Sequence, residues 1–120
     1  MSRPRFFADE DLHGDIVRAV RRFAPSIDFT TAVQQGLQSA PDEEILGAAW
    51  RSHWLVVSHD VRTLRSAAEL RIASGQGIHG VFLASQSRSV REVADAIVLI
   101  GEASEFEEWH NQVWFIPFSP

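Results

Sequence analysis

The feature that most constrains the fold is a repeated alternation of short apolar runs with amphipathic segments along the 120 residues. Runs of mostly apolar or β-branched residues, bounded by polar or turn-forming residues, predict strands. Because helical patterns separate the strands, the alternation predicts a parallel sheet with right-handed crossovers and helices on both faces. We therefore expect one three-layer α/β/α domain over residues 1–120, with a five-stranded, mainly parallel sheet. The expected strands are residues 6–8, 27–31, 54–58, 81–84 and 113–118.

Four segments between these strands carry apolar residues at helical spacing, and two of them have clear end signals. In the second, Ser39 is expected to cap a helix whose start also contains an early proline and three acids. In the fourth, we expect Gly101 to end the helix. A short helical turn is expected over residues 105–109, and Pro117 predicts that the last strand lies at a sheet edge. The four helices are expected to begin near Asp15, Ser39, Leu64 and Val90.

Composition excludes several kinds of chemistry. The chain has no cysteine, which removes disulfides, thiolate zinc sites and cysteine nucleophiles. All 11 basic residues are arginine, so Schiff-base chemistry, a P-loop lysine and the lysine of receiver domains are absent too. The net charge of −5 argues against binding nucleic acid by bulk electrostatics, although a basic patch or a metal can reverse the sign locally. With no secretory signal or membrane-spanning run, we expect a cytoplasmic protein without membrane contact.

Acidic residues follow two of the predicted strands. Asp9 and Glu10 come directly after the first, and Asp60 follows the third. Ligands of open parallel sheets bind beyond the C-terminal ends of the strands. If the first and third strands are neighbours, as in a 2-1-3-4-5 order, Asp9 and Asp60 lie close together and raise each other's pKa unless a cation joins them. Oxygen ligands favour Mg²⁺ or Mn²⁺, which can activate water in phosphodiester cleavage.

Structural roles compete with these catalytic ones. Acids in a first helical turn complement the helix dipole, so Asp42 is as well explained by a cap as by a metal. His13 and His59 can serve as acid–base groups or as hydrogen-bonded structural histidines. Ser58 can orient a water or satisfy a loop amide. The tryptophans are better explained by packing than by base stacking. A set of arginines can face RNA or simply be solvated: Arg18, Arg21, Arg22, Arg62 and Arg65.

Three motifs occur in order within residues 6–60: FFADEDL at 6–12, APDEEIL at 40–46 and LVVSHD at 55–60. Together they resemble the short bacterial PIN-like domains, which are minimal relatives of PIN-domain ribonucleases such as the VapC-type toxins. The resemblance implies a PIN sheet of 3-2-1-4-5 type or its shortened equivalent. It also implies Mg²⁺ or Mn²⁺ held by acids and metal-dependent RNA cleavage, often by the toxin of a toxin–antitoxin pair.

Carried over position by position, the resemblance implies that Asp9, Glu43 and Asp60 are the catalytic, metal-binding acids, with Asp42 or Glu44 as substitutes for Glu43. RNA is then the substrate, an antitoxin protein is a partner, and the chain forms a homodimer. The accessory candidates around these acids are Glu10, His13, Ser58, His59 and Arg62.

Arg62 stands where such domains usually carry a further acid. Its guanidinium can hold a substrate phosphate, or it can form a salt bridge with Asp60 or Asp9 in a degenerate site. We therefore keep two hypotheses of different class. The first is a metal-dependent endoribonuclease. The second is a catalytically degenerate PIN-like module that binds a protein or oligomerises through its apolar tail, residues 113–118.

A phosphatase of the haloacid-dehalogenase type is a weaker alternative. The Asp9-x-Asp11 spacing after a strand matches its aspartyl nucleophile motif. Those enzymes are longer and usually carry a lysine and a paired acid motif, and this chain supplies neither.

Overall fold

The computed structural model describes residues 2–118. Strands and helices alternate along the chain as the sequence pattern predicts. The strands are β1 (Arg5–Ala8), β2 (Asp28–Thr31), β3 (Leu55–Ser58), β4 (Val81–Ala84) and β5 (Val113–Ile116). The helices are α1 (Gly14–Phe23), α2 (Asp42–Ser52), α3 (Thr63–Ala73), α4 (Val90–Ala103) and a short 3-10 helix, η1 (Phe106–Trp109).

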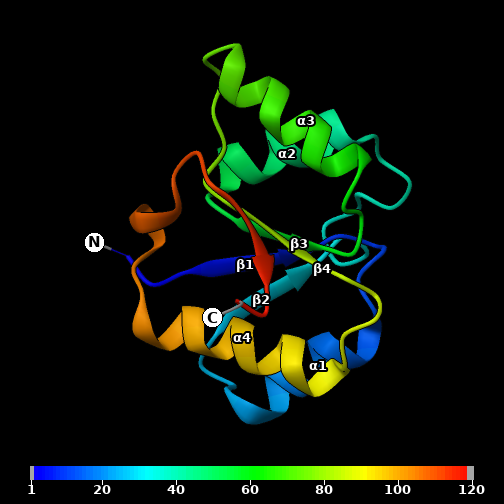
Figure 1. Cartoon of the computed structure of the whole chain (residues 1–120), viewed down its shortest axis with the longest axis vertical. Helices are drawn as coiled ribbons and strands as arrows, with labels where there is room; N and C mark the ends of the chain where they lie inside the picture. The colour runs from blue at the N-terminus through cyan, green and yellow to red at the C-terminus, as the bar shows by residue number, and fades with distance from the viewer. Residues whose placement is uncertain (1, 119–120) are drawn as a thin grey trace.

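The strands form a single sheet in the order β2-β1-β3-β4-β5, and every pairing is parallel. In Figure 1, α2 and α3 lie above the sheet, and α1 and α4 lie below it. Each face of the sheet is therefore covered by two helices, which accounts for the continuous apolar runs of the central strands. The predicted three-layer α/β fold is confirmed, and β5 occupies the predicted edge.

The strand order differs from the 3-2-1-4-5 type that the resemblance implied. Here β1 has only one strand on its β2 side, because the chain crosses back after β2 and places β3 on the other side of β1. The observed order is the one that makes the first and third strands neighbours, with Ala8 opposite Val57. The C-terminal ends of β1 and β3 consequently lie side by side.

Alternating side chains of β1 divide the core between the two faces of the sheet. Phe6 packs into the cluster under α1 and α4, whereas Phe7 packs into the cluster under α2 and α3. Both phenyl rings are fully buried, and Phe7 stacks on Trp54 at 5.1 Å. β1 is thus anchored from both sides, which fixes the position of the residues that follow it.

Two predicted helix ends are wrong. Ser39 does not cap α2: the N-cap position is Pro41, and no side chain caps it. Gly101 does not end α4, which continues to Ala103. A Cβ at Gly101 would lie 2.7 Å from Cδ1 of Ile27, so the glycine is explained by close packing against the segment before β2. Local end signals give no information about such a tertiary contact.

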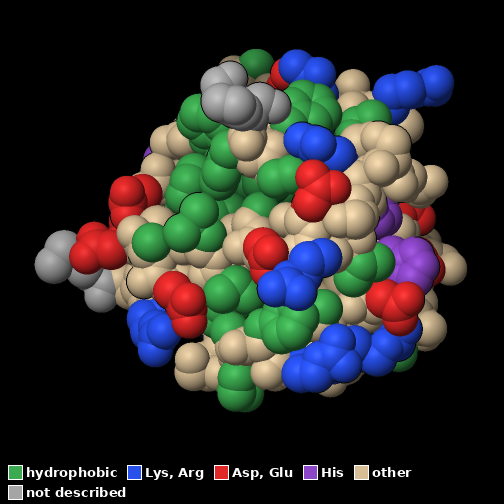
Figure 2. Space-filling view, turned by 60° about the horizontal axis from the view of Figure 1, so that its bottom comes forward, with side chains coloured by type: hydrophobic (Ala, Val, Ile, Leu, Met, Phe, Trp, Pro, Cys, Tyr) green, Lys and Arg blue, Asp and Glu red, His purple; other side chains and the backbone are tan. Residues whose placement is uncertain are grey.

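The surface over α1 and α4 mixes charged and apolar side chains, with arginines and acids interspersed (Figure 2). Trp114, Phe115 and Phe118 at the C-terminal edge are exposed. Of the tryptophans that were expected to pack, Trp54 is therefore buried whereas Trp114 is not. Within residues 2–118, no helix is both long and apolar enough to cross a membrane.

Candidate active site

Asp9 is the first residue after β1, and its amide continues the sheet by donating to the Val57 carbonyl at 2.9 Å. The residue is only 8% exposed, which is unusual for an aspartate. One carboxylate oxygen, Oδ2, accepts a hydrogen bond from the Ser58 hydroxyl at 2.8 Å, and Oδ1 accepts one from the Glu10 amide at 2.9 Å. The sheet register therefore produces a buried, oriented carboxylate at the joint end of two neighbouring strands.

The pKa of Asp9 is raised above its usual range. Burial is the main cause, because it disfavours the ionised form. The hydrogen bonds from Ser58 and from the Glu10 amide lower the pKa, while the negative charges of Asp11 and Asp42 raise it further. The negative charges of Asp11 and Asp42 thus lie near Asp9. A cation bound there would stabilise the ionised carboxylate and lower its pKa.

Ser58 connects the ends of two segments that carry acids. The side chain is fully buried in the last position of β3. Its hydroxyl donates to Asp9 and accepts a hydrogen bond from the Asp60 amide at 2.9 Å. One buried hydroxyl therefore sets both the direction of the Asp9 carboxylate and the path of the backbone that leads to Asp60.

Asp60 is held by the first turn of α3. Its Oδ1 accepts hydrogen bonds from the amides of Arg62 at 3.1 Å and Thr63 at 2.9 Å, and its Oδ2 accepts one from the Thr63 hydroxyl. Partial burial raises the pKa of Asp60, but these bonds and the Leu64 amide outweigh it, so the pKa is below its usual range. In this structure the carboxylate caps the turn that leads into α3, although the N-cap position of the helix itself is Arg62.

The three acids at the start of α2 differ in their relation to Asp9. Asp42 is half-buried and is the acid of this turn whose charge raises the pKa of Asp9. Glu43 and Glu44 are exposed. Glu10 also reaches this region, because its Oε1 accepts a hydrogen bond from the Ser39 amide at 2.6 Å. The geometry therefore associates Asp42 with Asp9 more closely than the Glu43 that the resemblance favoured.

The remaining accessory candidates have varied surroundings. His13 is the N-cap of α1, where its Nδ1 accepts from the Asp15 amide at 3.1 Å. Nδ1 of His59 lies 2.8 Å from the Ala84 carbonyl. The Arg62 guanidinium is exposed, and among residues 2–118 no ion pair joins it to Asp9 or Asp60. The salt bridge considered for a degenerate site is absent from the described chain.

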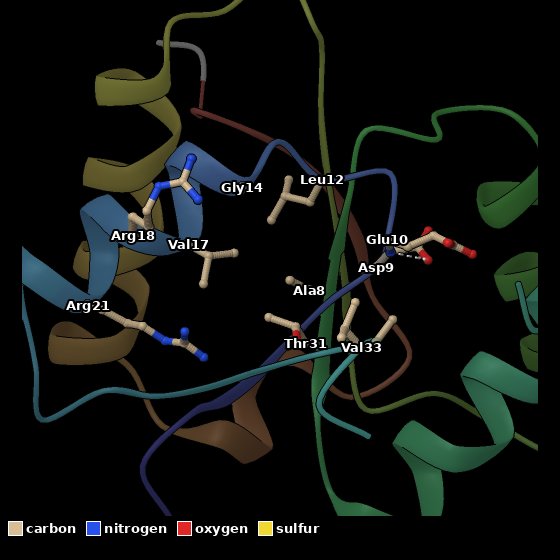
Figure 3. A pocket seen from close by; sticks show the side chains of 11 residues that line it. Ala8, Asp9, Glu10, Leu12, Gly14, Val17, Arg18, Arg21, Thr31 and Val33 are labelled. Atoms are coloured by element: carbon tan, nitrogen blue, oxygen red, sulfur yellow. Dashed lines mark hydrogen bonds between the residues drawn. The ribbon is translucent and has the colours of Figure 1, made fainter. Parts of the chain in front are cut away.

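A hollow of about 250 Å³, open to solvent, lies beside Asp9 between α1 and the segment that follows β2. Figure 3 shows Arg18 and Arg21 on one side of it and the backbone of Asp9 and Glu10 on the other. The carboxylates of Asp9 and Glu10 point away from the hollow in this view. The apolar part of the lining comes from Ala8, Leu12, Val17, Ala32 and Val33.

A comparison with protein families identifies the chain's relatives. The model of a family described as "PIN like domain" matches residues 4–85, about two thirds of the chain. The chain belongs to the PIN-like domain family. The match spans β1 to β4 and includes Asp9, Asp42, Ser58 and Asp60. Comparisons with curated proteins and with solved structures gave no significant match.

Whether this PIN-like domain fits a divalent cation depends on its donors. No group of three or more Asp, Glu or His side chains within residues 2–118 is arranged to hold a metal ion. Mg²⁺, however, usually keeps several waters and needs only one or two protein carboxylates. Asp9, supported by the neighbouring charge of Asp42, fits such a water-rich site. Their oxygen donors suit Mg²⁺ or Mn²⁺ better than zinc.

Sequence reasoning found the acids but not the arrangement around them. The hydrogen bonds of Asp60 at the start of α3 depend on how the loop after β3 turns. The three-residue spacing of Asp60 and Thr63 is compatible with such bonds but does not by itself predict them. The hollow is formed by α1 and the segment after β2, so no single motif signals it. Its two arginines were part of the candidate RNA-facing set.

Proposed function

We propose that this PIN-like protein is a metal-dependent endoribonuclease centred on Asp9. The observation that carries the proposal is a buried carboxylate at the switch point of a parallel sheet, with its pKa raised by burial and by two further acids. Perturbed acids that converge at such an edge are typical of functional sites. Membership of the PIN-like family supports the same reaction class.

In the proposed site, Asp9 and Asp42 hold the cation. When bound, Mg²⁺ or Mn²⁺ would supply Lewis-acid chemistry, that is, activation of a water and stabilisation of charge on the phosphate oxygens. Ser58 keeps the Asp9 carboxylate in one orientation through the 2.8 Å hydrogen bond to Oδ2. Asp60 contributes by fixing the turn between β3 and α3. It can become a metal ligand only if its carboxylate gives up the hydrogen bonds to Arg62 and Thr63.

Arg62 is proposed to bind the substrate phosphate. Its guanidinium is exposed at the start of α3, immediately after the acidic edge, and its planar donors suit a phosphate group. A cation at this place lowers the local negative charge, which favours the approach of RNA to a chain of net charge −5.

Cleavage of a labelled single-stranded RNA, followed while Mn²⁺ or Mg²⁺ is titrated, tests the proposal. We expect cleavage that requires the metal and is lost in Asp9→Asn. Asp42→Asn should reduce the rate more than Glu43→Gln, a matched removal of one negative charge from the same helical turn. Metal-independent cleavage, or full activity of Asp9→Asn, would exclude Asp9 as the centre of a metal-dependent nuclease.

The biological setting that we propose is the toxin of a toxin–antitoxin pair, acting in the cytoplasm as a homodimer. Expression of the wild-type chain alone should then slow cell growth, whereas Asp9→Asn should not. Light scattering of the purified protein tests the dimer, because a mass of 13.5 kDa would identify a monomer. Equal growth with both chains would argue against a toxin.

A second candidate is a degenerate PIN-like module that binds another protein. Two observations favour it: the Asp60 carboxylate is engaged by α3, and Trp114, Phe115 and Phe118 are exposed at the sheet edge. Isothermal titration with Mn²⁺ separates the candidates. No binding and no cleavage would favour the degenerate module, and binding that is lost in Asp9→Asn would favour the nuclease.

A further inference from the structure

The hollow beside Asp9 combines a cationic rim with an apolar floor. Arg18 and Arg21 project from one face of α1, one turn apart, and Figure 3 places both at the same side of the hollow. The floor is formed by apolar side chains that include Leu12, Val17 and Val33, of which Val33 is 61% exposed. Its volume of about 250 Å³ is slightly below the range of pockets for drug-sized ligands, so it would hold only a small ligand.

Arg21 is held in place without a carboxylate. Its Nη2 donates to the Phe29 carbonyl and to Oε1 of Gln34, both at 2.8 Å. Both acceptors are neutral, so the charge of the guanidinium is not compensated by these contacts. Its Nε and Nη1 groups make no hydrogen bond within the described residues, so they can donate to a ligand. A fixed, uncompensated guanidinium loses little entropy when it binds an anion.

Arg18 adds a second positive charge at the rim. Its Nη2 pairs with Asp15, but both side chains are more than half exposed, so the pair is weak and can exchange for a phosphate. Arg22, the third arginine of α1, lies over the Phe23 ring, with its guanidinium carbon 5.4 Å from the ring centre. The rim of the hollow thus carries two arginine side chains, although the net charge of the chain is −5.

We propose that this hollow binds one nucleotide of single-stranded RNA, with its phosphate at Arg18 and Arg21 and its base or ribose on the apolar floor. The inference rests on the proposed nuclease function. The hollow and the acidic site share the backbone of Asp9 and Glu10 as a common wall, while the two carboxylates point to the other side. An RNA strand that crosses this wall would place one nucleotide in the hollow and its next phosphate near Asp9.

Binding measured without metal tests the hollow separately from catalysis. The probes are uridine 5′-monophosphate, uridine and a six-residue oligouridine, titrated in EDTA and followed by NMR shifts of backbone amides. We expect the nucleotide to shift the amides around Leu12, Val17 and Val33 and to bind more tightly than uridine. Shifts elsewhere, or equal binding of nucleotide and nucleoside, would overturn the proposal.

Substitutions at the rim and the floor identify the contacts. Arg18→Gln should weaken oligouridine binding by about tenfold or more, the loss expected for one charge-assisted contact, and should lower the dependence on salt. Val33→Asp should weaken it about tenfold by placing a negative charge on the floor. The matched controls, Arg51→Gln at the far end of α2 and Leu70→Asp on exposed α3, should bind as wild type. Equal effects of the variants and their controls would overturn the proposal.

The two proposals fail in different ways. If Asp9→Asn abolishes cleavage but Arg18→Gln and Val33→Asp leave binding and KM unchanged, the nuclease stands and the hollow is not its nucleotide site. If the hollow binds oligouridine in EDTA but no metal produces cleavage, the nucleotide site stands and the nuclease function fails. Asp9→Asn should retain binding in the hollow, because its carboxylate points away from it.

Discussion

The Ser58 hydroxyl donates a 2.8 Å hydrogen bond to Oδ2 of Asp9 across the two central strands of the sheet. Both side chains are buried, and the same hydroxyl accepts from the Asp60 amide. The orientation of the buried Asp9 carboxyl group thus depends on a residue 49 positions away in the chain.

Replacement of Ser58 by alanine should destabilise the fold and raise the pKa of Asp9. The substitution leaves a buried carboxylate oxygen and the Asp60 amide without their partner, which costs about 1–3 kcal/mol. The loss of the Ser58 hydrogen bond also removes an effect that lowers the Asp9 pKa. Denaturant unfolding and an NMR titration of the Asp9 carboxyl group measure the two changes. Ser66→Ala, at an exposed position of α3, is the control and should change neither.

Ionisation of Asp9 should oppose folding at neutral pH. Because its folded-state pKa lies above the usual 3.8, the penalty is absent below pH 3.8 and develops as the pH rises from there through the folded-state pKa. We expect Asp9→Asn to have a flatter dependence of the unfolding free energy on pH over this window. Its Tm should be above the wild-type value at neutral pH. A steeper pH dependence in Asp9→Asn would contradict this expectation.

Removal of Asp60 should weaken α3 independently of any catalytic effect. Asp60→Ala loses the acceptor for two backbone amides and the Thr63 hydroxyl, and we expect a cost of about 1–2 kcal/mol. Asp60→Asn keeps a capping oxygen and should retain most of the stability. Because the pKa of Asp60 is lowered in the folded state, its contribution is present above pH 3.8 and is lost as the pH falls through the folded-state value. Chemical unfolding of the two variants at several pH values checks this.

If Asp60 is also a metal ligand, the two variants separate the roles. Both should then lose cleavage activity, although only Asp60→Ala is substantially destabilised. Full activity in a folded Asp60→Asn protein would restrict Asp60 to the structural role.

Alanine at Gly101 should destabilise the protein although it favours helix. The new Cβ would lie 2.7 Å from Cδ1 and 3.1 Å from Cγ1 of Ile27, and such overpacking costs about 1–3 kcal/mol. The gain in helix propensity offsets about 1 kcal/mol of this. Ile27→Val removes the nearest methyl group, so the double variant should recover part of the lost Tm. Thermal unfolding of the single and double variants tests the contact, and an increase in Tm for Gly101→Ala alone would refute it.

The sequence by itself determined the order of strands and helices along the chain. Each element buries one face, and the spacing of the apolar residues on that face can be read from the segment alone. The runs around Phe6, Leu55 and Val81 predicted the parallel core, and Pro117 predicted the edge strand. The resemblance of three sequence motifs to the PIN-like domains was confirmed by the family match. The position of Asp9 at the carboxyl end of β1 followed from the same local pattern.

Only the tertiary structure decided what these residues contact. Two carboxyl groups that follow neighbouring strands look equivalent in the sequence, yet Asp9 is buried against Ser58 whereas Asp60 caps the turn that leads into α3. Their pKa values therefore shift in opposite directions. The close approach of Gly101 to Ile27 likewise joins residues far apart in the chain. Local periodicity specifies which face of an element is buried, but burial and hydrogen bonding at a sheet edge depend on which segments the topology brings together.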